Sequence, residues 1–87
     1  MPMQASEIED LIRAANMGEV PAMADLGRAY LRGQGVRASY ASARQWLTKA
    51  ADAGHPGATA SLGQMYAEGL GVGVNKRRAA GYFEQAI

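Results

Sequence analysis

Few residues of this 87-residue chain are of a type that supports catalysis. Cysteine is absent, so the chain has no thiolate nucleophile, disulfide or cysteine-ligated zinc. The single histidine, His55, stands beside Pro56-Gly57 without a partner nearby, and we expect an exposed or helix-capping residue. The carboxylates Glu7, Glu9 and Asp10 are spaced for a solvated helix start rather than for acid–base catalysis. We therefore predict no enzymatic activity, no catalytic residue and no metal site.

A glycine-rich segment, Gly33-Gln34-Gly35-Val36-Arg37-Ala38, superficially fits the dinucleotide-binding fingerprint. That fingerprint needs a preceding strand, so that the phosphates meet the N-terminus of the following helix. Here the glycines follow a predicted helix and recur 36 residues later. We interpret both copies as turns and expect no cofactor.

The basic run Lys76-Arg77-Arg78 leaves two interpretations open. The favoured one is a solvated helix surface, and the alternative is a patch for an anionic partner. The net charge is only +1, so the chain lacks the electrostatic field that would indicate nucleic-acid binding.

The elements that would position these residues repeat along the chain. A shift of 36 residues superimposes glycines, alanines and aromatic residues in one register. The first motif contains Ala22, Ala24, Leu26, Gly27 and Tyr30, and the second contains Ala58, Ala60, Leu62, Gly63 and Tyr66. We predict one domain over residues 1–87, with a half-repeat (1–18) and two repeats (19–54 and 55–87), the second of them truncated.

Capping and breaking residues predict helices over residues 6–17, 21–32, 39–53, 57–68 and 75–87. Ser6-x-x-Glu9 is a capping-box pattern, and Ser39 and Asn75 suit helix starts. Gly27 and Gly63 lie in mid-helix, where we expect a neighbouring backbone to come close. The predicted fold is all-α: a right-handed α/α superhelix of about five helices, built from 36-residue helix–turn–helix repeats.

The pattern Ala22-x-x-x-Leu26-Gly27-x-x-Tyr30-x-x-Gly33-x-Gly35-Val36 and its second copy resemble the Sel-1-like repeats of the tetratricopeptide superfamily. That resemblance implies an α/α solenoid of a kind found in bacteria, in which the first helices of successive repeats line a concave groove for a peptide or protein. The groove positions that it implies are Arg28, Leu31, Arg32, Gln64, Ala67 and Glu68. Arg28 and Arg32 share a helix face and could clamp a carboxylate, or Arg32 could pair with Glu68.

The predicted function is a protein–protein interaction module, an adaptor or scaffold. Two alternatives remain: an inhibitor or immunity-type partner of a toxin, and, less favoured, a hydrolase. Some cysteine-rich relatives are linked to β-lactam binding or hydrolysis, but this chain lacks their cysteines.

No apolar stretch approaches the roughly 20 residues of a membrane span. No signal peptide is evident either, so the chain as it stands reads as cytoplasmic, although a removed signal would leave the same sequence. Solenoids usually need three repeats for stability, so we expect a fragment, a partner-stabilised chain or a homo-oligomer formed through the C-terminal helix.

Overall fold

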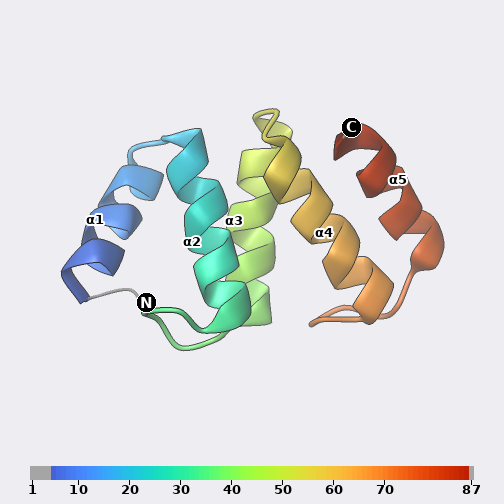
Figure 1. The fold of residues 1–87 in the computed structure, drawn as a ribbon, viewed down its shortest axis with the longest axis horizontal. Helices are drawn as coiled ribbons and strands as arrows, with labels where there is room; N and C mark the ends of the chain where they lie inside the picture. The colour runs from blue at the N-terminus through green and yellow to red at the C-terminus, as the bar shows by residue number, and fades with distance from the viewer. Residues whose placement is uncertain (1–4, 87) are drawn as a thin grey trace.

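The computed structural model describes residues 5–86, and within that range the regular structure is entirely α-helical (Figure 1). The five helices are α1 (Ala5–Asn16), α2 (Val20–Arg32), α3 (Tyr40–Asp52), α4 (Pro56–Glu68) and α5 (Lys76–Ala86). This confirms the predicted all-α fold of five helices. Ile87, the predicted last residue of the fifth helix, lies outside the described residues.

Glycines in the left-handed region end the helices at repeated positions. The positive-φ residues form three pairs, each separated by 36 residues: Gly18 and Gly54, Gly33 and Gly69, Gly35 and Gly71. Gly33 and Gly69 cap α2 and α4 with φ of 68° and 69°, a conformation that glycine adopts without a Cβ penalty. The backbone therefore follows the same 36-residue period as the sequence.

Side-chain caps begin three of the helices. Ser39 Oγ accepts from the Ser42 N–H at 3.2 Å, and Asn75 Oδ1 accepts from the Arg78 N–H at 2.9 Å, which confirms both predicted caps. The third cap, His55, belongs to the candidate site below. The predicted capping role of Ser6 is wrong, because Ser6 lies inside α1, which also includes Ala5.

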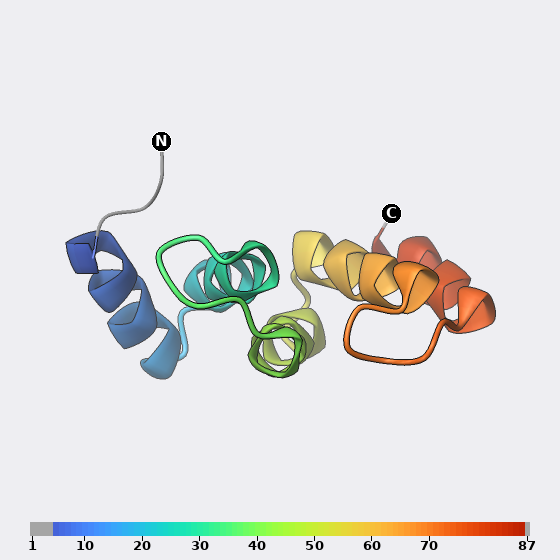
Figure 2. The same ribbon diagram turned by 90° about the horizontal axis from the view of Figure 1, so that it is seen from below.

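The helices follow one another along the longest axis of a molecule measuring 38 × 23 × 20 Å (Figure 1). Helix α3 lies below α2 and α4 and packs against both of them (Figure 2). The end helices have fewer neighbours, since α1 packs only on α2 and α5 packs only on α4. The two repeats therefore meet through α2, α3 and α4.

Small side chains let the helices approach, and a few large ones fill the space between them. The largest fully buried side chains are Leu26, Leu47, Leu62 and Met65. A Cβ on Gly27 would lie 2.6 Å from Leu47 Cγ, and one on Gly63 would lie 2.8 Å from Phe83 Cε1. The mid-helix glycines therefore seat a side chain of the next helix. A neighbouring backbone also comes close at Gly27, as the sequence predicts, since Leu47 N lies 3.2 Å from the position of the added Cβ. At Gly63 the three nearest atoms all belong to the Phe83 ring.

Candidate protein-binding surface

The predicted groove residues come from α2 and α4, which lie side by side (Figure 1). Arg28 and Leu31 are half-buried, and Leu31 packs against the core cluster that α4 shares with α2 and α3. In the second repeat, the equivalent of Arg28 is Gln64, which is exposed, and the equivalent of Leu31 is Ala67, which is half-buried. In the first repeat these two positions help to join the repeats, since Leu31 packs in the shared core and Arg28 reaches Gly57 of α4.

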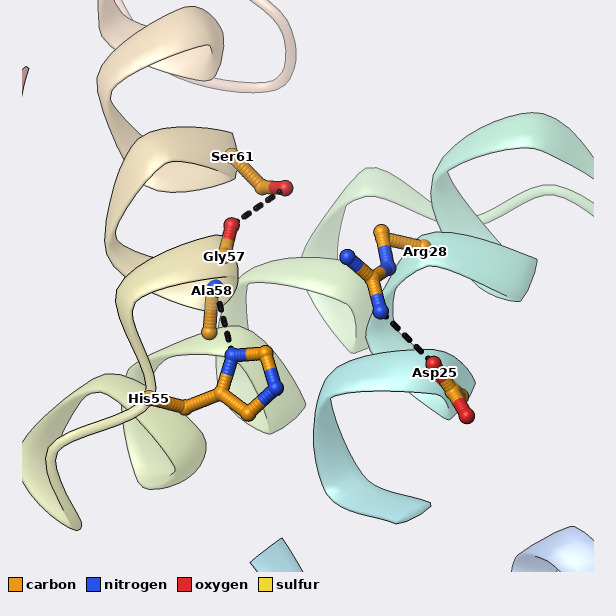
Figure 3. Close-up of polar contacts among 6 residues, drawn as sticks. All are labelled: Asp25, Arg28, His55, Gly57, Ala58 and Ser61. Atoms are coloured by element: carbon orange, nitrogen blue, oxygen red, sulfur yellow. Dashed lines mark hydrogen bonds and ion pairs between the residues drawn. The ribbon is translucent and has the colours of Figure 1, made fainter. Parts of the chain in front are cut away.

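Arg28 reaches from α2 to the N-terminal turn of α4. Its Nη2 donates to Asp25 Oδ1 at 2.6 Å, and its Nη1 would lie 3.1 Å from a Cβ on Gly57 of α4 (Figure 3). Asp25 precedes Arg28 by one turn, whereas Arg32 follows it by one turn. A clamp made by both arginines would therefore share the Arg28 guanidinium with Asp25.

His55 caps the N-terminus of α4. Its Nδ1 accepts from the Ala58 N–H at 3.0 Å, which confirms the predicted capping role (Figure 3). An accepting Nδ1 places the ring proton of the neutral imidazole on Nε2. The ring edge, Cε1, would be 2.9 Å from a Cβ on Gly57, so this glycine makes room for both His55 and Arg28.

The sequence did not predict this junction, at which Arg28 and its partner Asp25 meet Gly57 of α4, with His55 and Ser61 beside it (Figure 3). Ser61 Oγ donates to the Gly57 carbonyl at 3.0 Å, within the first turns of α4. One signal was present in the sequence. Each of these residues differs in type from the residue at the equivalent position of the other repeat, 36 positions away. For example, the equivalent of Gly57 is Pro21. Residues that break an internal repeat mark the places where the repeats are not interchangeable.

The remaining predicted residues lie toward the C-terminal ends of α2 and α4. Arg32, Gln64 and Glu68 are exposed. The alternative ion pair between Arg32 and Glu68 is not formed, since the ion pairs within residues 5–86 are Arg13–Asp10 and Arg28–Asp25. Two exposed side chains gain little from pairing in water, because solvent screens their charges and ordering them has an entropic cost.

An aromatic stack on α4 and α5 engages part of the basic run. The rings of Tyr66 and Tyr82 are stacked with their centroids 5.6 Å apart, and the Arg78 guanidinium lies 4.6 Å from the Tyr66 centroid. A hydrogen bond to Tyr82, followed by electrostatic interaction with Tyr66 and Tyr82, raises the pKa of Arg78 above its usual range. Arg78 is charged at neutral pH, as arginine is in proteins in general, and Lys76, Arg77 and Arg78 are all exposed.

Two hollows of the described surface lie away from the predicted residues. One of about 410 Å³ is lined by Arg44, Gln45, Thr48 and Lys49, all on the exposed face of α3. Another of about 260 Å³ is lined by Arg78, Gly81, Tyr82 and Gln85. Because each is lined from a single helix, neither encloses a small molecule in the way that cofactor sites do.

Residues 5–86 contain no group of three histidine or acidic side chains placed to hold a metal ion. Over the same range, every helix is too short or too polar to cross a membrane.

Comparison with known proteins places these features in a family. Residues 20–55 and 56–87 each match the model of the Sel1 repeat, one residue after the repeat starts expected at 19 and 55. A Sel1 repeat protein from Oxalobacter formigenes is 32% identical, with a TM-score of 0.90 over 94% of this chain and 63% of its own. A protective antigen present in uropathogenic Escherichia coli strains, which displays the same repeat fold, is 42% identical. Its TM-score is 0.89 over 95% of this chain and 18% of its own.

The chain thus spans less than two thirds of either of these solved structures. No curated protein matches it significantly in sequence.

Proposed function

The chain belongs to the Sel1 repeat family, and from that premise we propose that it is an adaptor or scaffold that binds a peptide or protein along α2 and α4. Sel1 repeats are generally protein-interaction modules. The contact surface proposed here is the exposed set Arg32, Gln64 and Glu68, which we call the α2–α4 face.

The observation that carries this proposal is a reversal of charge at one repeated position. Arg32 ends α2 and Glu68 ends α4, so the same place in successive repeats presents a cation and then an anion. Both side chains are exposed, and neither takes part in an ion pair found within residues 5–86. A partner with an acidic and a basic group one repeat apart would fit in a single direction, which favours specific recognition.

Binding is favoured over catalysis because the residues suited to catalysis are used in local structure. The Nδ1 lone pair of His55 accepts the Ala58 N–H, which removes the acceptor that a general base would need on that nitrogen. The hydroxyls of Ser39 and Ser61 also bond within their own helix starts. These contacts support the proposal that the chain has no enzymatic activity.

Charge reversal on the α2–α4 face tests the proposal. The tagged protein is used to capture partners from the cells that produce it, and it is compared with a variant carrying Arg32→Glu and Glu68→Lys. The matched control carries Arg44→Glu and Glu84→Lys, which change the same charges at exposed positions on α3 and α5. We expect at least tenfold lower partner recovery with the first variant and unchanged recovery with the control. Equal recovery with all three proteins would overturn the proposal.

A further inference from the structure

Helix α5 carries a hollow on the side where Tyr82 packs against the core cluster of α2, α3 and α4. The hollow has a volume of about 260 Å³ and is lined by Arg78, Gly81, Tyr82 and Gln85. No acidic side chain lines it, and a Cβ on Gly81 would meet no atom within 4 Å, so the space above this glycine is open. The hollow is therefore accessible from solvent and has a positive charge on its wall.

The Arg78 side chain is already ordered on the surface of the protein. Its guanidinium lies 4.6 Å from the ring centroid of Tyr66 and 6.0 Å from that of Tyr82, and the two rings are stacked on each other. The ion pairs within residues 5–86 do not include Arg78. A guanidinium that is supported on an aromatic face keeps the N–H donors at its edge available, and its prior ordering lowers the entropic cost of binding an anion.

The equivalent side of α3 stays open although two further helices follow it. Gln45, Trp46 and Lys49 of α3 occupy the positions that correspond to three of the lining residues. Gln45 and Lys49 are exposed, Trp46 is half-buried, and Gln45 and Lys49 line the hollow of about 410 Å³ on α3. Helices placed after α5 as α4 and α5 are placed after α3 would therefore leave the α5 hollow open.

The two hollows differ in the cation that rests on the aromatic ring. In the first repeat Lys49 Nζ lies 4.8 Å from the Trp46 ring centroid, and Ser42 stands at the position of Arg78. The fold therefore does not require an arginine at this position. Arg44 also lines the α3 hollow, but the cation–aromatic contacts within the described residues are those of Lys49 and Arg78. An ordered guanidinium can bind an oxyanion through two parallel hydrogen bonds, whereas an ammonium acts as a point charge.

We propose that the hollow on α5 binds a phosphate monoester group, with the Arg78 guanidinium as a bidentate donor and the Gln85 amide as a second donor. Arg77, the preceding residue, is also exposed, so a phosphate of nearly two negative charges matches the local charge better than a carboxylate. The donors are side chains, since the Arg78 backbone N–H already donates to Asn75 Oδ1. The hollow takes the phosphate alone and leaves the rest of the ligand in solvent. This site is separate from the α2–α4 face and does not depend on the proposed function.

NMR titration of the isotopically labelled full chain tests the proposal, with phosphoserine blocked at both ends as the probe. We expect saturable shifts of the backbone amides of residues 77–85 and of the Arg78 Nε–H. Sodium chloride at the same ionic strength and blocked serine without phosphate should not reproduce them. Arg78→Gln should weaken binding at least tenfold, and Arg78→Lys should also weaken it, because lysine keeps the charge without the planar fork.

Two further variants separate binding from folding. Gly81→Glu places a carboxylate in the hollow without replacing the stacked side chains, and we expect the same tenfold loss. Arg37→Gln makes the same change of net charge as Arg78→Gln at an exposed residue outside the hollow, and it should bind the probe normally. Circular dichroism checks that each variant is helical.

Shifts that do not saturate beyond the salt control, or an affinity unchanged by Arg78→Gln and Gly81→Glu, would overturn the proposal. So would saturable shifts confined to α3 near Arg44 and Lys49, because the phosphate would then bind the other hollow. Separate titrations with glycerol phosphate and with a phosphoserine peptide distinguish the two sources of such a group. Equal affinity would assign the site to a free phosphate ester, and tighter binding of the peptide would assign it to a phosphorylated partner protein.

Discussion

Gly27 and Gly63 occupy equivalent places in two helices, yet they face different neighbours. A Cβ on Gly27 would lie 2.6 Å from Cγ of Leu47, a fully buried side chain. A Cβ on Gly63 would meet ring atoms of Phe83, which is partly exposed and can turn outward. At the residue scale, the pair separates the effect of packing from that of helix propensity.

We expect Gly27→Ala to lower the free energy of unfolding by about 1–3 kcal/mol, because overpacking in a closed core outweighs the gain of about 1 kcal/mol in helix propensity. Gly63→Ala should stay within about 1 kcal/mol of the parent, because Phe83 can move. Urea denaturation of both variants measures the difference. Equal losses would show that the two glycines do not differ in the way described.

The N-caps of α2 and α4 form a second matched pair. His55 accepts a hydrogen bond from the backbone of α4, whereas Glu19, 36 positions earlier, makes no side-chain cap bond. We expect His55→Ala to lower the free energy of unfolding by about 0.5–2 kcal/mol and His55→Asn to preserve it, since asparagine also caps. Glu19→Ala should change it by less than about 0.5 kcal/mol. Thermal or urea unfolding followed by circular dichroism gives all three values, and similar effects for the two alanine variants would contradict the cap assignment.

Residue type and place predicted the caps of Ser39, His55 and Asn75, because a cap depends only on a side chain and the turn that follows it. The contact of Arg28 with the start of α4 could not be predicted in this way. It depends on how the second repeat stacks on the first and on the room left by Gly57. Local rules therefore identify the helix ends, while the junction between repeats requires the structure.

At the element scale, the helices are of similar length but differ in the number of other helices that they pack against. Helices α2 and α4 each pack against three others, α3 packs against two, and α1 and α5 pack against one each. We expect amides of α1 and α5 to exchange with deuterium faster than those of α2, α3 and α4, because helices with few buried contacts open locally. Mass spectrometry of peptides from each helix checks this order, and uniform protection along the chain would contradict it.

The existence and order of all five helices were predicted from the sequence, and the ends that lie well inside the described residues, those of α2, α3 and α4, agree with the structure to within one residue. The helix ends are indicated by glycines and capping residues that occur at equivalent positions in both repeats. The start of α1 was predicted less well, because Ser6-x-x-Glu9 resembles a cap but lies within the helix. A single copy of a local signal is weaker than one that recurs at the same place.

At the scale of the whole molecule, stability depends on a few large side chains in a core made mostly of alanine. We expect Leu47→Ala to lower the free energy of unfolding by about 2–5 kcal/mol, because Leu47 is fully buried at the junction of the repeats. Phe83→Ala, at the equivalent but exposed position, should have a smaller effect. Urea unfolding of both variants decides this, and a larger loss for Phe83→Ala would mean that the Phe83 side chain is buried in solution.

Equivalent positions in the two repeats also differ in whether they contribute to the core or remain accessible to a partner. Where the next helix covers a repeat, Leu31 and Leu47 contribute to the shared core. At the equivalent positions of the second repeat, Ala67 is half-buried and Phe83 is exposed. The protein-binding surface that we propose is the α2–α4 face rather than the outer face of α3.

Site-specific photo-crosslinking in the cells that produce the protein tests this placement most directly. A photoreactive residue replaces either Gln64, on the α2–α4 face, or Gln45, an equally exposed glutamine on the outer face of α3. If the α2–α4 face binds the partner, we expect a discrete protein adduct from position 64, identified by mass spectrometry, and none from position 45. Adducts from position 45 alone, the same adducts from both positions, or none from either would contradict it.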